Sequence, residues 1–169
     1  MPLTKRADFP QRRSTRPFGD RVRGIPMDDD ESLPLIIALD TNVLVQSLPG
    51  GGRFRAIMNS FITGRVHLVV STEILLKNQE VLDEISGRNA GTVLQELLAN
   101  YQVHVVKVEP TFRGNAILDD PDDNKFVDAA VTANAHWIVT EDGHFDVLEH
   151  NTLLTIRPMT PHRLIDRHL

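Results

Sequence analysis

The strongest fold signal in this 169-residue chain is a short apolar run that stops abruptly at a carboxylate. Residues 35–39 are all apolar, and Asp40, Thr41 and Asn42 follow directly. An uninterrupted apolar run of this length is typical of a parallel strand that is buried on both faces. In open α/β sheets, ligands bind at the carboxyl edge of the strands, where Asp40 would lie. Because a buried carboxylate needs a cation or several hydrogen bonds, this strand predicts a ligand-binding edge.

Apolar patterns divide the rest of the chain into alternating strands and helices. Further strands are predicted at 66–70, 103–108, 137–139 and 153–156. Helices are predicted at 53–61, 72–86, 90–99, 124–134 and 145–148, with a short C-terminal helix opened by Pro161. Strands that alternate with helices are typical of a parallel sheet covered on both faces. The predicted fold class is therefore α/β, a three-layer sandwich around a central parallel sheet.

The composition of the chain excludes several kinds of functional site. The chain has no cysteine, which excludes disulfides, thiolate catalysis and cysteine zinc sites. No apolar run approaches the roughly 18 to 20 residues of a membrane span, and no signal-peptide core follows the first residue, so we expect a cytoplasmic protein. The formal net charge is −5.

This net charge hides a basic arm. The first 24 residues hold seven Lys or Arg against two Asp. We expect residues 1–33 to be a disordered extension and residues 34–169 to form the globular domain. The arm is either a segment that binds phosphates or a tail without function that precedes a true start at Met27.

Three acidic segments are predicted to meet at the same edge of the sheet. Asp40 ends one strand, and Thr140, Glu141 and Asp142 follow another. The acid-rich run 119–124 precedes a predicted helix, although its turn-favouring residues would form a loop in any case. Carboxylates without Cys or paired His suit Mg²⁺ or Mn²⁺, which hydrolyse phosphodiesters without a protein nucleophile. Asn42 and Thr140 have the short polar side chains needed to orient a carboxylate or a water.

The same residues resemble the PIN domain family, in particular its bacterial branch of toxin components. Three motifs in order carry the resemblance, at 39–44, 120–130 and 133–145. The family implies a Rossmann-like fold, Mg²⁺- or Mn²⁺-dependent cleavage of single-stranded RNA, frequent homodimers and a cognate antitoxin. By position, Asp40, Asp123 and Asp142 match the metal-binding acids. Asn124, which follows Asp123, and Asp128 are expected to orient the substrate. Asp128 would face the ion only if the helix register shifted by one residue.

Lys77 departs from the family pattern. Aligning Ser71 and the pair 81–82 with that pattern puts Lys77 where the second acid, a glutamate, belongs. An ammonium there would weaken cation binding by like-charge repulsion. Glu73 or Glu80, about one turn away on the same helix face, would replace the missing acid; or Lys77 would hold a phosphate as a point charge; or the site has partly decayed.

Three functions therefore remain open from the sequence. The first is a metal-dependent ribonuclease, and the second is a catalytically impaired RNA-binding or regulatory protein, motivated by Lys77. The third is a phosphatase of another Rossmann-like family, against which Asn42 counts, since it stands where a paired aspartate would be needed. The scattered histidines show no metal-binding spacing and are expected mostly at the surface, with His144 the nearest to an acid of the site.

Overall fold

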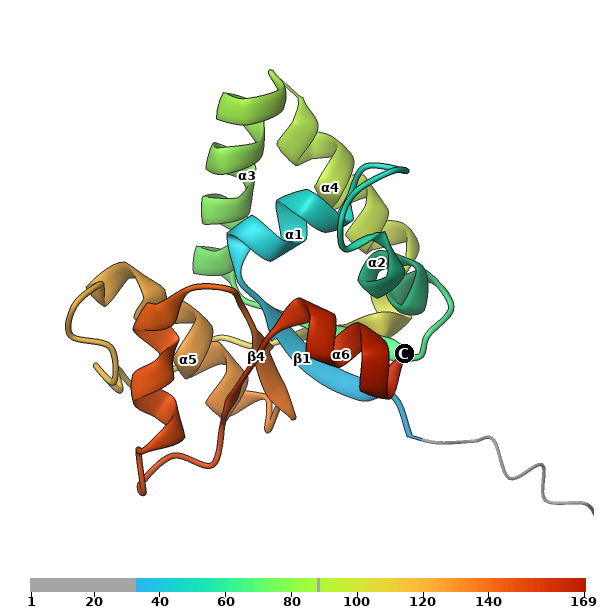
Figure 1. Ribbon diagram of the computed structural model, residues 1–169. Coiled ribbons are helices and arrows are strands. Elements are labelled where there is room, and N and C mark those ends of the chain that lie inside the picture. The colour runs from blue at the N-terminus through green and yellow to red at the C-terminus, as the bar shows by residue number, and fades with distance from the viewer. Residues whose placement is uncertain (1–32, 88) are drawn as a thin grey trace, which may run out of the picture. The chain divides into compact units, whose positions relative to one another are not determined.

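The computed structural model describes residues 33–87 and 89–169, so the predicted arm, apart from Leu33, lies outside the described residues. In that part of the chain, five strands form one parallel sheet in the order β3-β2-β1-β4-β5 (Figure 1). The strands are β1 (Leu35–Leu39), β2 (Val66–Val70), β3 (Val105–Lys107), β4 (Trp137–Val139) and β5 (Pro158–Met159). The predicted α/β class with a central parallel sheet is confirmed.

Helices cover both faces of the sheet. The α-helices are α1 (Thr41–Ser47), α2 (Arg55–Ile62), α3 (Thr72–Ser86), α4 (Ala90–Asn100), α5 (Asn124–Thr132) and α6 (Pro161–His168). Three 3₁₀ helices are η1 (Gln102–His104), η2 (Pro121–Asp123) and η3 (Gly143–Glu149). Residues of α1, α2, α4 and α6 build one core, and residues of α5 and η3 build the other. Helix α3 contributes Leu82 to the first core and Ile74 to the second. Figure 1 shows these elements around the sheet. No helix in the described residues is long and apolar enough to cross a membrane.

The central strand β1 shows why its apolar run is uninterrupted. Ile37 and Leu39 pack into the first core, while Ala38, between them, packs into the second. Successive side chains of a strand point to opposite faces, so a strand with a core on each side must be apolar at every position. The three-layer arrangement thus follows directly from residues 35–39.

Two of the differences from the sequence prediction concern the presence of a whole element. The predicted strand 153–156 is wrong: these residues form a loop in which Leu153 is 90% exposed, and β5 lies two residues further along. The sheet bonds there run from the Ile138 amide to the Arg157 carbonyl and from the Thr140 amide to the Met159 carbonyl. Pro158 has no N–H, but an edge strand tolerates it. Helix α1 was not predicted, because residues 41–47 begin with two small polar side chains.

A buried polar contact joins α1 to α3. The Thr41 hydroxyl donates to Asn78 Oδ1 at 2.7 Å, and both side chains are buried. We expect Asn78→Leu to lower the free energy of unfolding by about 1 to 2 kcal/mol, because it leaves a buried hydroxyl without its acceptor. Urea unfolding of this variant, of Thr41→Val and of the double variant would measure the coupling. If the two single losses simply add, the contact is not what stabilises this junction.

Candidate active site

The sheet order changes direction at β1. From β1 the chain passes to β2 on one side, and it later returns to place β4 on the other side of β1. Leu39 pairs with Val139, so Asp40 and Thr140, one residue on, emerge side by side at the carboxyl edge. This is the position at which open α/β sheets bind ligands. The strand-end acids therefore lie where the sequence placed them.

Asp40 is held firmly in a buried position. Its side chain is 6% exposed, Oδ2 accepts a 2.9 Å hydrogen bond from the Thr140 hydroxyl, and Oδ1 accepts a long one of 3.4 Å from the Asn42 amide. Burial raises the pKa of Asp40, the two hydrogen bonds oppose that rise, and the nearby charge of Asp142 adds to it. The carboxylate that begins α1 is thus oriented by its neighbours and strained electrostatically.

Thr140 connects the two strand-end acids. Its hydroxyl donates to Asp40 and accepts the Asp142 amide at 2.9 Å. Asp142 in turn accepts the His144 amide at 2.9 Å and so begins η3. The predicted orienting role of Thr140 has this geometric basis. The side chain of Asn42, by contrast, is exposed, and only its backbone amide contacts Asp40.

Asp123 provides the third carboxylate, from the turn that precedes α5. Burial, with the charges of Asp120, Asp40 and Asp142 adding to its effect, raises the pKa of Asp123 to about 6. Its Oδ2 atom is buried and has no hydrogen-bond partner. A buried carboxylate oxygen without a partner, surrounded by like charges, is costly unless a cation is present. The residues present therefore fit a divalent ion.

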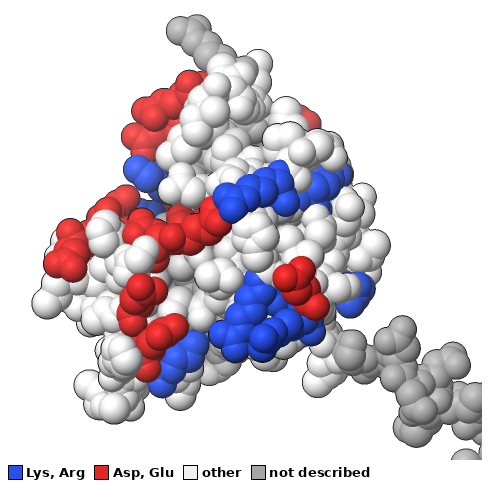
Figure 2. All heavy atoms as spheres, viewed as in Figure 1, with Lys and Arg blue, Asp and Glu red and all other residues white. Residues whose placement is uncertain are grey.

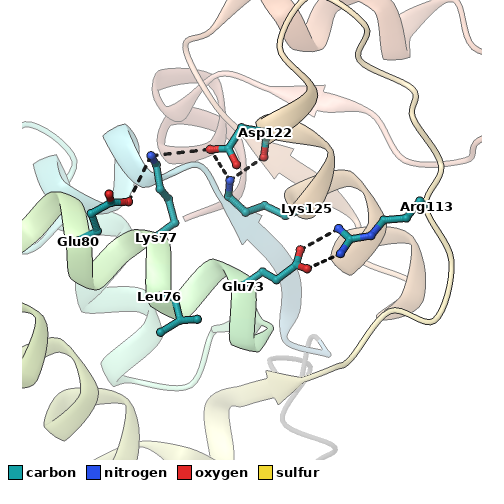
Figure 3. Close-up of a pocket in the computed structure, with 7 residues that line it drawn as sticks. All are labelled: Glu73, Leu76, Lys77, Glu80, Arg113, Asp122 and Lys125. Carbon is teal, nitrogen blue, oxygen red and sulfur yellow. Dashed lines mark hydrogen bonds and ion pairs between the residues drawn. The ribbon is translucent and has the colours of Figure 1, made fainter.

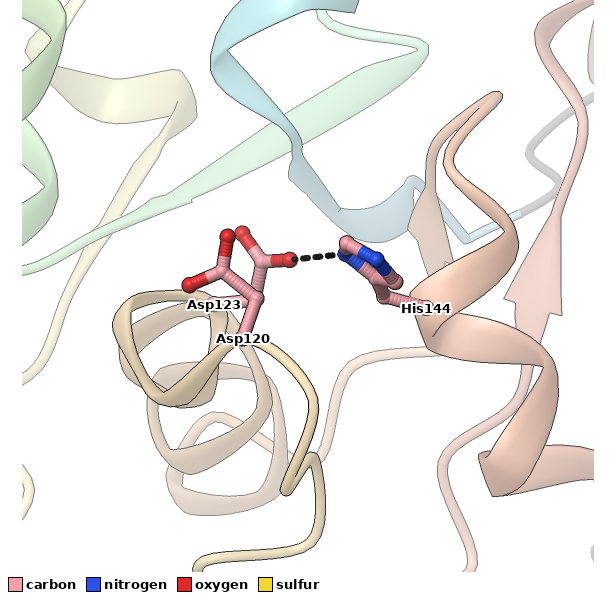
Figure 4. A group of neighbouring side chains, drawn as sticks. All are labelled: Asp120, Asp123 and His144. Carbon is pink, nitrogen blue, oxygen red and sulfur yellow. Dashed lines mark ion pairs between the residues drawn. The ribbon is translucent and has the colours of Figure 1, made fainter.

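Asp120 and His144 complete the group. One ligand atom from each of Asp120, Asp123 and His144 can be chosen so that all lie within 4.8 Å of one another (Figure 4). The imidazole Nδ1 of His144 lies 3.6 Å from Asp123 Oδ2 and 3.4 Å from Asp142 Oδ1. Sequence reasoning assigned neither residue to the ion. A signal for Asp120 was available, since it belongs to the acid-rich run 119–124 that precedes α5.

The residues predicted around the second-acid position lie in a neighbouring hollow of about 550 Å³ (Figure 3). The Lys77 ammonium lies 3.6 Å from Glu80 Oε2 and 3.7 Å from Asp122 Oδ2. Glu73 forms an ion pair with Arg113, which lowers the pKa of Glu73. Both glutamates proposed to replace the missing acid are therefore paired with cations.

Two further predicted residues support the loop rather than the cluster. Asn124 is 4% exposed; its side chain bonds the Ile117 backbone at 3.0 and 2.7 Å and the Pro121 carbonyl at 3.2 Å. Asp128 is 1% exposed and accepts the Gly114 amide at 2.9 Å, and it lines a separate small cavity together with Glu73 and Arg113. The structure therefore does not bring Asp128 to Asp40, and no shift of register is seen.

Charged side chains are unevenly distributed over the face of the molecule that Figure 2 shows. Figure 2 shows acidic side chains in a band that reaches the middle of the face, where it meets a run of basic side chains. Among the ion pairs at the carboxyl edge of the sheet, the Arg53 guanidinium lies 3.1 Å from the Glu141 carboxylate. A phosphate chain at this face would thus find a cation beside the acidic strand ends.

The family model of the PIN domain matches residues 37–144, more than half of the chain. A search of curated proteins found no match. Among solved structures, FitAcB from Neisseria gonorrhoeae is 19% identical, with a TM-score of 0.49 over 76% of this chain and 99% of that one. A structure of FitAB bound to an IR36 DNA fragment is 16% identical, with a TM-score of 0.48 over 74% of this chain and 94% of the other.

Proposed function

Because this chain belongs to the PIN domain family, we propose that it is a metal-dependent endoribonuclease that hydrolyses phosphodiester bonds in single-stranded RNA. The observation that carries the proposal is the buried Asp123 oxygen, which accepts no hydrogen bond and lies among the charges of Asp40 and Asp142. Carboxylates that repel one another at a ligand-binding edge are stabilised by a hard divalent cation. The chain has no cysteine nucleophile with which to replace that chemistry.

Each residue of the proposed site has a separate task. Asp40, Asp123 and Asp142 would hold Mg²⁺ or Mn²⁺, which when bound would activate water for attack on phosphorus and offset charge on the phosphate. Thr140 keeps Asp40 in position through its 2.9 Å hydrogen bond and fixes the turn that carries Asp142. Arg53, at 53% side-chain exposure, can exchange Glu141 for an RNA phosphate at small cost.

The nuclease domain is proposed to span residues 34–169. The family match ends at residue 144, but β5 pairs with β4 beyond that point. Leu164 of α6 is fully buried in the first core. The chain beyond the matched region therefore completes the sheet that holds Asp142.

The resemblance to bacterial toxin components supports a biological role. We propose that the protein is the toxin of a toxin–antitoxin pair, that a cognate antitoxin binds it, and that it forms homodimers. A small open reading frame beside its gene, whose product copurifies with this chain, is the expected observation.

Lys77 supports a second candidate function, an RNA-binding or regulatory protein that does not cleave. Three cations, Lys77, Lys125 and Arg113, line the hollow beside the site. Each of them is paired with an acid, however: Lys77 with Glu80 and Asp122, Lys125 with Asp122, and Arg113 with Glu73. We favour cleavage because the charge of Lys77 is compensated locally and so repels an ion less strongly than an unpaired ammonium would.

Incubating the full chain with single-stranded RNA, single-stranded DNA and duplex DNA tests the function. We expect cleavage of the RNA with Mn²⁺ or Mg²⁺ and none with EDTA. Cleavage that persists in EDTA would overturn the metal-dependent assignment, and preferential cleavage of DNA would overturn the substrate.

A Lys77→Glu variant separates the two candidate functions in the same assay. If the native chain cuts RNA, the ribonuclease proposal stands whatever the variant does. If only Lys77→Glu cuts, while the native chain binds RNA in a salt-dependent way, the non-cleaving function replaces it.

A further inference from the structure

We propose that His144 and Asp120 are direct ligands of the ion at the carboxylate cluster, and that the imidazole makes the site prefer Mn²⁺ and related transition ions over Mg²⁺. This inference rests on the proposed function, since it concerns the ion of the same site. It adds two ligands that the motif-based assignment of Asp40, Asp123 and Asp142 does not contain.

The backbone places the imidazole among the carboxylates. The His144 amide donates to Asp142 Oδ1 at 2.9 Å, so the first turn of η3 folds His144 back over the acid two residues before it. The ring Nδ1 then lies 3.4 Å from Asp142 and 3.6 Å from Asp123. Both distances exceed those of ordinary N–H···O hydrogen bonds. The nitrogen is therefore near two carboxylates without being committed to either.

These separations suit atoms that share one ion. Ligand atoms about 2.1 Å from a metal lie roughly 3 Å apart when adjacent and roughly 4 Å apart when opposite. The two Nδ1 distances fall in that interval, and the group with Asp120 lies within 4.8 Å. Small shifts of these side chains would bring all of their ligand atoms within coordination distance of one ion.

Asp120 reaches the same place through the 3₁₀ turn η2. Its Oδ1 accepts the Asp122 amide at 3.0 Å, which begins the turn and leaves Oδ2 available. Asp120 caps η2 and Asp123 ends it, and the two carboxylates project side by side toward His144 (Figure 4). Asp123 Oδ2 is buried and accepts no hydrogen bond, so a cation shared with Asp120 and His144 would stabilise it.

The donor set decides which ion is preferred. Mg²⁺ favours all-oxygen ligation and holds its waters tightly, whereas imidazole nitrogen suits first-row transition ions. One nitrogen among carboxylates therefore favours Mn²⁺, and Co²⁺ more strongly still, over Mg²⁺. A site made only of Asp40, Asp123 and Asp142 would lack this discrimination.

Pulsed electron paramagnetic resonance on the Mn²⁺-loaded full chain tests the ligation directly. We expect modulation from a coordinated ¹⁴N nucleus in the native protein and in the control His150→Ala, which removes an exposed histidine after η3. The signal should vanish in His144→Ala. Absence of ¹⁴N coupling in the native chain, or its persistence in His144→Ala, would overturn the proposal.

Calorimetric titration with Mn²⁺ and Mg²⁺ tests the preference. We expect His144→Ala to weaken Mn²⁺ binding by at least about tenfold, the lower end of what losing even an outer partner costs a metal site. Mg²⁺ binding should change much less, while Asp120→Asn should weaken both. Equal losses for both ions in His144→Ala overturn the preference but leave the proposed nuclease intact. Failure of the native chain to bind any ion overturns both.

Discussion

Replacing Asp40 by Asn is expected to lower metal-dependent RNA cleavage by at least about a thousandfold without unfolding the protein. A catalytic metal contributes several kcal/mol to transition-state stabilisation, and each 1.4 kcal/mol corresponds to a factor of ten. Asn keeps the shape of Asp and still offers an oxygen to the Thr140 hydroxyl, which now lies 2.9 Å from Asp40. The Asp40→Asn substitution removes the negative charge that would hold the ion.

Initial cleavage rates, together with circular dichroism and thermal unfolding, measure this effect. Asp166→Asn, an exposed acid on α6, is the matched control and should keep the native rate. A folded Asp40→Asn variant that cleaves at the native rate would contradict the assignment of the site to this edge of the sheet.

Replacing Asp123 by Asn is expected to stabilise the metal-free protein at pH 8 by about 3 kcal/mol. Burial and the neighbouring acids together raise the pKa of Asp123 to about 6, whereas in the unfolded chain it is near 3.8. A shift of about two units corresponds to about 3 kcal/mol. For a chain of this size the melting temperature would rise by roughly 6 to 12 °C.

The pH dependence follows from the direction of this pKa shift. The folded state binds the proton more tightly than the unfolded state, so stability falls as the pH rises from about 4 to about 6. Above about pH 6 the loss of folding stability caused by the Asp123 carboxylate is complete. The stabilising effect of Asp123→Asn should therefore shrink toward pH 4.

Thermal unfolding of the native chain, Asp123→Asn and the control Asp166→Asn between pH 4 and pH 8 measures this. With saturating Mn²⁺ the order should reverse, because the native protein gains stability from the bound ion and the variant gains less. Equal melting temperatures for native and Asp123→Asn at pH 8 without metal would show that the carboxylate is not electrostatically strained.

Strands whose own residues indicate burial were predictable from the sequence. The strands at 35–39, 66–70 and 137–139 were predicted with the bounds that the structure shows, because each is apolar enough to be buried. The rule that ligands bind at the carboxyl edge placed Asp40 and Asp142 together. Helix α1 was not predicted, because it is stabilised by the packing of Val43 and Leu44 into the first core rather than by the helix propensities of its residues.

Features that depend on the meeting of distant segments were not predictable. Arg113 pairs with Glu73 forty residues away, and no local pattern encodes that contact. The position of the Lys77 ammonium between Glu80 and Asp122 depends on how α3 packs against the acidic turn. The entry of His144 into the cluster likewise required a 3₁₀ turn, where an ordinary short helix had been expected.

Three acids of the cluster also begin the helical element that follows them. Asp40, Asp120 and Asp142 each accept the backbone amide two residues further along, in α1, η2 and η3. Each carboxylate is thus anchored by its own segment before any ion arrives. A site assembled in this way can release and recapture its ion while the protein stays folded. Its turnover would then follow the free concentration of that ion, so that the supply of metal in the surroundings would set the rate at which the protein works.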